Sequence, residues 1–197
     1  AWKLAGVIRG RTDVSVLDTY ETERIAFART LIQTTDGAFQ KLSSDSVIAS
    51  FLRTRIAPSV VRWISSWDFA APKLFQTISQ IRIEYPDSDL SAGKLGQVHA
   101  GMRLPWVQSL DNHQVLGTDW QLHVYGDVAD DVRAEAGRLG IEVPAFAWTS
   151  ACKDAGLTEG GVYLLRPDGH VGVAARAERA AAQLRDYAEQ HGLCALG

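Results

Sequence analysis

The sequence is poor in sulfur, with two cysteines and one methionine among its 197 residues. Cys152 and Cys194 form no CxxC pair, and no histidine lies near Cys152 at metal-ligand spacing. This pattern gives no dithiol redox motif and no zinc motif. So few cysteines also disfavour a disulfide-stabilised secreted scaffold, and we expect a cytoplasmic protein.

Long apolar runs and strongly charged stretches are also absent. No segment approaches the roughly 20 apolar residues that cross a bilayer, and the N-terminus lacks a signal-peptide layout. The net charge is -3: residues 1–72 hold nine basic and seven acidic residues, and residues 73–197 hold eleven and sixteen. No basic cluster is interleaved with aromatic residues. We therefore expect neither a membrane nor a nucleic acid as partner.

Short catalytic and cofactor motifs are missing as well. The sequence contains no GxGxxG, no GxxxxGK[ST] and no GxSxG, and its five histidines show neither HxH nor HExxH spacing. His123 falls within a strand pattern and is expected to be satisfied or exposed, whereas His170 is expected at the surface. The sequence thus predicts no catalytic residue, no cofactor-binding residue and no metal ligand in this chain.

The first third of the chain has helical periodicity. A helix over residues 1–9 is expected to end at Gly10, and a second is expected from about Val16 to Gln33, with Ser15 and Asp18 at capping-box spacing. A third helix is expected over roughly Ser46–Trp63, bent at Pro58. The pattern predicts a helical segment over residues 1–72.

Arg24 lies on the apolar stripe of the second expected helix. A buried arginine requires a carboxylate partner, and Glu21 or Asp18 on the preceding turn is a candidate. The sequence therefore predicts a structural ion pair at Arg24.

The remaining residues, 73–197, alternate between strand and helix patterns. A strand is expected at 81–85, followed by a loop-rich stretch. The turn Arg166–Gly169 has proline and glycine where a type I turn needs them. The further expected elements are strand 120–125, helix 130–139, strand 141–148, a hairpin of 161–165 with 170–174, and helix 177–191.

This order predicts the fold class, a thioredoxin-like α/β sandwich preceded by a helical segment. The helix after the first strand acts as the crossover of a parallel pair, and the hairpin adds antiparallel strands. A thiol oxidoreductase would have CxxC at the start of that helix, but residues 126–131 contain no sulfur. Thiol–disulfide exchange is therefore disfavoured.

Three sets of residues carry a family resemblance. WKLA at residues 2–5 with Val7 and Gly10 is followed by LDTYE-x-ER at residues 17–24, and RPDG-x-V lies at residues 166–171. The sequence resembles the C-terminal part of FAD-dependent aromatic hydroxylases, the single-component flavoprotein monooxygenases of the phenol hydroxylase and polyketide-tailoring type. Residues 79–85 and the G-x-R-x-P segment at 101–105 match the family in the same order.

The resemblance implies a parent enzyme that hydroxylates an aromatic small molecule with FAD, NAD(P)H and O₂. Residues 1–72 would be the last helices of a truncated FAD-binding domain, and 73–197 a thioredoxin-like domain without CxxC. The FAD motifs would lie upstream, in a missing N-terminal flavin domain, so this chain is expected to be inactive alone. In relatives the C-terminal domain can help form a homodimer or cover the substrate.

Two features depart from the family pattern, and a second interpretation stays open. Ala26 stands where the family often has proline, and Gly126–Asp127 lacks the continuation of the family's GD motif. The chain also begins at Ala1 without a methionine, and we therefore interpret it as a piece of a longer protein. The alternative is a stand-alone thioredoxin-like protein-binding module without redox activity.

Overall fold

The computed structural model of the chain describes residues 1–25, 28–29, 32 and 83–195. By their packing, residues Ala1–Glu23 and Glu84–Gly197 form one compact unit and Arg24–Ile83 a second. The domain boundary expected at residue 72 and the helix expected over Ser46–Trp63 lie outside the described residues.

A four-stranded sheet lies at the centre of the first unit, in the order β4-β3-β5-β6. β3 (Gln121–Tyr125) is parallel to β4 (Ala145–Phe146) and antiparallel to β5 (Gly161–Leu165), which pairs antiparallel with β6 (Val171–Arg176). The crossover from β3 to β4 contains α6 (Asp130–Arg138). This topology confirms the expected thioredoxin-like arrangement.

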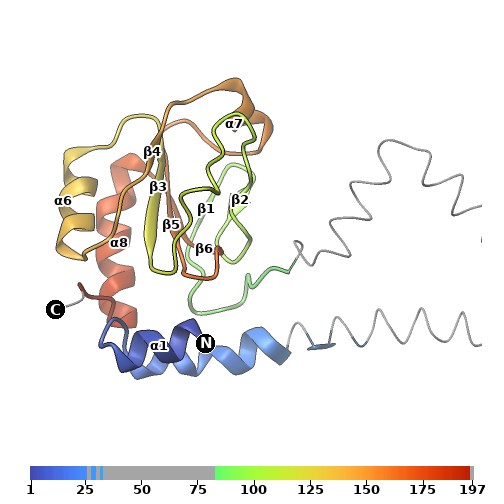
Figure 1. Cartoon of the computed structure of the whole chain (residues 1–197), viewed down its shortest axis with the longest axis vertical. Coiled ribbons are helices and arrows are strands. Elements are labelled where there is room, and N and C mark those ends of the chain that lie inside the picture. Colours follow the sequence, from blue (N-terminus) through green and yellow to red (C-terminus); the bar gives the residue numbers. More distant parts are fainter. Residues whose placement is uncertain (26–27, 30–31, 33–82, 196–197) are drawn as a thin grey trace, which may run out of the picture. The chain divides into compact units, whose positions relative to one another are not determined.

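Helices and loops cover both faces of the sheet (Figure 1). α6 and α8 (Ala177–His191) pack on one face, whereas α7 (Ser150–Asp154) and the two-stranded sheet of β1 (Lys94–Leu95) and β2 (Val98–His99) lie on the other. All five residues of β3 and all five of β5 are consequently buried. Strands buried on both faces need apolar side chains at nearly every position, and VYLL in β5 has them.

The helix boundaries mostly follow the sequence signals. α8 spans the residues expected for it and ends at Gly192, whose φ of 60° is left-handed. The hairpin turn also forms as expected: Gly169 has a φ of 79°, and its N–H donates to the Arg166 carbonyl at 2.9 Å. No helix in the described part of the chain combines the length and apolar character needed to cross a membrane.

Three strand and cap expectations are wrong. Residues 83–85 are not a strand; the Tyr85 N–H donates to the Gly101 carbonyl, and the chain turns at once. β4 is two residues long, because Pro144 has no N–H to extend the ladder. Asp13, not Ser15, caps the next turn, since its side chain accepts from the Ser15 N–H.

The N-terminal residues form α1 (Trp2–Ile8), a 3₁₀ turn η1 (Val14–Leu17) and a helical run over residues 19–25. From Val14 to residue 25, the buried positions are Val16, Thr19 and Glu23. They share one helical face, but two of the three are polar. This face packs against the hairpin turn between β5 and β6 through charges, and the candidate site lies there.

Candidate functional site

The three motifs of the sequence meet in one buried group of charges, which we call the charge cluster: Lys3, Glu23, Arg166 and Asp168. Lys3 comes from α1, Glu23 from the helix over 19–25, and the other two from the turn after β5. Lys3, Glu23 and Arg166 are each no more than 5% exposed. Buried charges are costly unless they are paired, so the pairing decides what the cluster does.

Arg166 is the centre of the cluster, and its side chain is 0% exposed. Its guanidinium donates to both carboxylate oxygens of Glu23, at 2.7 and 3.2 Å, and to both of Asp168, at 2.7 and 3.2 Å. Two bidentate contacts use the planar fork of an arginine on two sides at once. A lysine at this position could not make them.

Glu23 is saturated by its neighbours. Besides Arg166, it accepts from Lys3 Nζ at 2.8 Å and from the Ser88 hydroxyl at 2.8 Å. Lys3 also donates to the Thr19 hydroxyl at 2.5 Å. Two cations and two carboxylates therefore balance one another, with hydroxyl groups taking the remaining hydrogen-bonding positions.

Aromatic rings enclose the cluster. The Arg166 guanidinium lies 5.2 Å from the Trp2 ring centre and 5.6 Å from that of Tyr85. The Trp2 indole N–H donates to Asp168 at 2.9 Å, so the same ring contacts a cation with its face and a carboxylate with its edge. This enclosure keeps water from the pair of Arg166 and Glu23 and strengthens it, whereas the Asp168 side chain stays 26% exposed.

The environment lowers the pKa values of Asp168, Glu23 and Lys3, but for different reasons. Burial alone would raise the pKa of Asp168 and of Glu23, but hydrogen bonds and the charge of Arg166 hold both below their usual values, with His170 also acting on Asp168. Burial lowers the pKa of Lys3 against the opposing effect of Glu23. The carboxylates stay ionised and fully paired. Groups held in this way stabilise a structure, and they are poorly suited to exchange protons with a substrate.

Arg24 is not the buried cation. It lies on an exposed face of its helix, and the buried carboxylate is its neighbour Glu23. The ion pair of Arg24 with Glu21 or Asp18 stays a prediction, but the buried position expected for Arg24 is wrong, because it assumed that apolar residues define the buried face. That face carries Thr19 and Glu23 instead, because a cation from a turn 143 residues away meets it.

The two singled-out histidines are also placed differently from expectation. His170 is 3% exposed, beside Asp168 and the Tyr85 ring. His123 is fully buried against Phe146, and neither ring nitrogen has a hydrogen-bond partner among the described residues. Burial lowers the pKa of His123 to about 4, so its ring is neutral at pH 7. Cys152 is buried and Cys194 is exposed, and both are free.

A phosphate-binding helix start and a metal cluster are two kinds of site that the described residues allow to be judged. At the connection from β3 to α6, Asp130 and Asp131 occupy the first helical turn, where a pyrophosphate would need free N–H groups without like charge. No group of three or more histidine, cysteine or acidic side chains in the described ranges could hold a metal ion. No chemical step is therefore assigned to these residues.

Comparison with known proteins gives three agreeing results. A family model described as "FAD binding domain" matches residues 1–35. A curated 3-(3-hydroxy-phenyl)propionate/3-hydroxycinnamic acid hydroxylase from Burkholderia vietnamiensis is 45% identical over 158 residues. The match covers 72% of this chain and 28% of that protein, so the chain spans less than a third of its relative.

Solved structures share the fold at lower identity. The anhydrotetracycline hydroxylase OxyS from Streptomyces rimosus is 21% identical with a TM-score of 0.61, covering 96% of this chain and 38% of that one. The rebeccamycin biosynthetic enzyme RebC, with reduced flavin, is 22% identical with a TM-score of 0.61, covering 94% and 39%. These structures show the shared fold, and the family model together with the curated relative identifies the chain as a part of an FAD-dependent aromatic hydroxylase.

Proposed function

We propose that the chain contributes to a hydroxylase that uses FAD, NAD(P)H and O₂ to oxidise an aromatic small molecule, and that it is inactive alone. The observation that carries this proposal is the charge cluster. It joins residues 1–23, inside the segment matched by the FAD-binding family, to the thioredoxin-like sheet. The chain's own role is then to hold these two parts together.

An exposed apolar face on the N-terminal segment supports a missing flavin domain as partner. Leu4 and Ile8 lie one turn apart on α1 and are 54% and 76% exposed, and Val14 is 62% exposed. Apolar side chains grouped in this way usually mark an interaction surface. We place the preceding part of the flavin domain there. A cytoplasmic location suits the two free cysteines.

We take the proposed substrate class from the name of the curated relative. That relative is named for phenylpropionate and cinnamate substrates that carry a ring hydroxyl. We propose a hydroxylated aromatic acid as the substrate class. NAD(P)H as electron donor and a homodimeric assembly belong to the same proposal.

A chimera tests the proposal. This chain replaces the matching region of the Burkholderia vietnamiensis hydroxylase, and NAD(P)H consumption and hydroxylated product are measured with that enzyme's substrate. We expect retained flavin binding and measurable product. A chimera that folds and binds FAD but makes no product would contradict the proposal.

The chain alone provides the matching control. Titrating it with FAD is expected to leave flavin fluorescence unchanged, because the described residues form no phosphate cradle. Tight FAD binding would show that the inactivity proposal is wrong. The stand-alone binding module, the second interpretation, predicts full stability without a flavin domain but does not account for the family match over residues 1–35.

A further inference from the structure

The outer edge of β6 is only partly covered by other strands. Ala92 pairs with it in parallel fashion: its N–H donates to the Gly172 carbonyl at 2.8 Å, and its carbonyl accepts from the Ala174 N–H at 3.1 Å. Gly93 then turns the chain away with a φ of 89°. The next residue, Lys94, pairs with His99 instead of with β6.

Because the chain turns away at Gly93, it does not form the next pair of hydrogen bonds of the parallel ladder on β6. Peptide groups alternate in direction along a strand, so the Ala174 carbonyl and the Arg176 N–H both face this outer edge. Neither has a backbone hydrogen-bond partner there among the described residues, although Gly93 lies so close to the Ala174 carbonyl that a Cβ on it would be 2.6 Å from that oxygen. An unpaired acceptor followed by an unpaired donor is the pattern to which a further extended segment binds.

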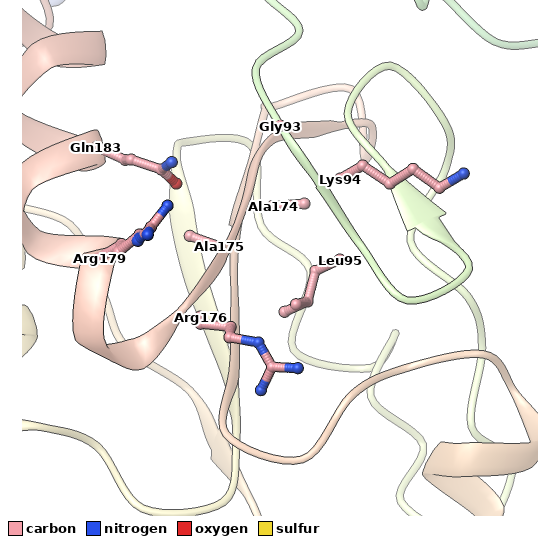
Figure 2. Close-up of a pocket in the computed structure, with 8 residues that line it drawn as sticks. All are labelled: Gly93, Lys94, Leu95, Ala174, Ala175, Arg176, Arg179 and Gln183. Carbon is pink, nitrogen blue, oxygen red and sulfur yellow. The ribbon is translucent and has the colours of Figure 1, made fainter.

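A hollow of about 460 Å³ lies where that segment would continue (Figure 2). Ala174, Ala175 and Leu95 form its apolar floor, while Arg179 and Gln183 extend from α8 toward the strand. The hollow is therefore bounded by an open strand edge and a helix.

The rim of the hollow is basic in an otherwise acidic part of the chain. Lys94, Arg176 and Arg179 are all exposed, and none forms an ion pair within the described residues. Figure 2 shows that they stand at different points of the rim, with Lys94 opposite Arg179 and Arg176 at the end of the strand. They are spread along the edge, as the charges of an extended ligand would be, and do not converge on one point.

We propose that this hollow binds an extended acidic peptide segment, which continues the sheet along β6. The peptide backbone would donate to the Ala174 carbonyl and accept from the Arg176 N–H, and carboxylates would meet the rim cations. A simple anion fits less well, because it has no donor for the Ala174 carbonyl. The proposal concerns a face separate from the charge cluster and does not depend on the proposed hydroxylase.

Binding can be measured with a labelled short peptide of alternating valine and glutamate and the full chain, by fluorescence anisotropy. We expect saturable binding that weakens as salt rises. Hydrogen exchange at the Arg176 amide should slow when the peptide is bound. A peptide with lysine in place of glutamate should not bind.

A second peptide separates strand addition from simple charge attraction. It keeps every glutamate but has proline at the valine positions, which removes backbone donors. Loss of binding supports the proposal. Equal binding of the two peptides would overturn the proposal and indicate a site for anions in general. Competition by inorganic phosphate at millimolar concentration would have the same meaning.

Protein variants locate the site. The double variant Arg176→Gln with Arg179→Gln should weaken peptide binding about tenfold, as for two lost exposed ion pairs. The matched control, Arg133→Gln with Lys153→Gln, makes the same charge change at exposed positions outside the hollow and should leave binding unchanged. Equal weakening of peptide binding in the two double variants would overturn the assignment. A concentration-dependent dimer that the first double variant abolishes would also overturn it.

Discussion

α8 and the N-terminal segment both pack against the thioredoxin-like sheet, but by different means. α8 contributes apolar residues, with Leu184 1% exposed and Ala180 fully buried. The N-terminal segment adds Val16 to the same apolar core, but it also contributes Lys3 and Glu23, and Glu23 pairs with both Lys3 and Arg166. Apolar contacts accept many partners of similar shape, whereas a buried ion cluster tolerates only the partner that completes it. We infer that the first attachment supplies stability and the second supplies specificity.

The largest effect is expected from breaking the ionic attachment. Glu23→Ala leaves the guanidinium of Arg166 buried with one carboxylate, and we expect the free energy of unfolding to fall by about 3–5 kcal/mol. Urea denaturation at pH 7 measures it. Glu21→Ala, at an exposed position of the same helix, is the control and should change stability by less than about 0.5 kcal/mol. A loss below about 1 kcal/mol for Glu23→Ala would mean that water reaches the cluster.

The apolar attachment should respond slightly less and in a different way. Leu184→Ala removes a side chain buried between α8 and the sheet, with an expected cost of about 2–4 kcal/mol. Because no charge is involved, this cost should be the same at low and high salt. A salt-dependent cost would erase the distinction between the two attachments.

Acid should weaken the sheet before it weakens the charge cluster. The pKa of His123 is lowered from 6.5 to about 4, so below pH 6.5 the unfolded chain takes up a proton that the folded chain refuses. Stability should fall by about 3 kcal/mol in all as pH falls from about 6.5 to about 4. Glu23 and Asp168, whose pKa values are lowered from 4.5 and 3.8, begin to add losses as the pH falls through those unfolded values, at the acid end of this range.

Denaturation curves across that pH range test the assignment to His123. In His123→Leu most of the slope should disappear, whereas His99→Gln, at a partly exposed ion pair with Glu84, should keep it. Identical slopes in His123→Leu and the unaltered chain would rule out this histidine. His191, whose pKa burial also lowers, would then be the source to examine.

The smallest expected effect isolates one hydrogen bond of the cluster. Trp2→Phe keeps an aromatic ring beside Arg166 but removes the indole N–H that donates to Asp168. We expect a loss of about 1–1.5 kcal/mol in thermal or urea unfolding. A cost as large as that of Glu23→Ala would show that the ring itself, through its contact with Trp120, carries the attachment.

The sheet and its helices were predictable because their signals are local. The RPDG turn, Gly192 and the periodicity of α8 each act within a few residues, and those elements form where expected. The charge cluster was not predictable in the same way. Its partners are separated by 143 residues, and Glu23 reads as a solvated charge until Arg166 is known to face it. The motif residues themselves, present in three places, were the only available signal.

The expectation for His123 was wrong for a related reason. Its place in a strand predicts which face it occupies, but not that Phe146 and the loops beyond β2 cover that face. The period of a strand predicts the face of the sheet to which a side chain points, whereas the residues that cover that face depend on tertiary packing. The open edge of β6 was likewise invisible, because it results from the turn at Gly93.

The distance along the chain between Glu23 and Arg166 also affects the order of folding. The carboxylate is made before the guanidinium, which lies 143 residues further along the chain. Until then Glu23 can pair with Lys3 but not with Arg166, so residues 1–23 cannot complete their docking on the sheet. Closing so long a loop is slow but adds little to the entropic cost. The RPDG turn would thus serve as a late checkpoint: the N-terminal helices dock only on a hairpin that has already been built.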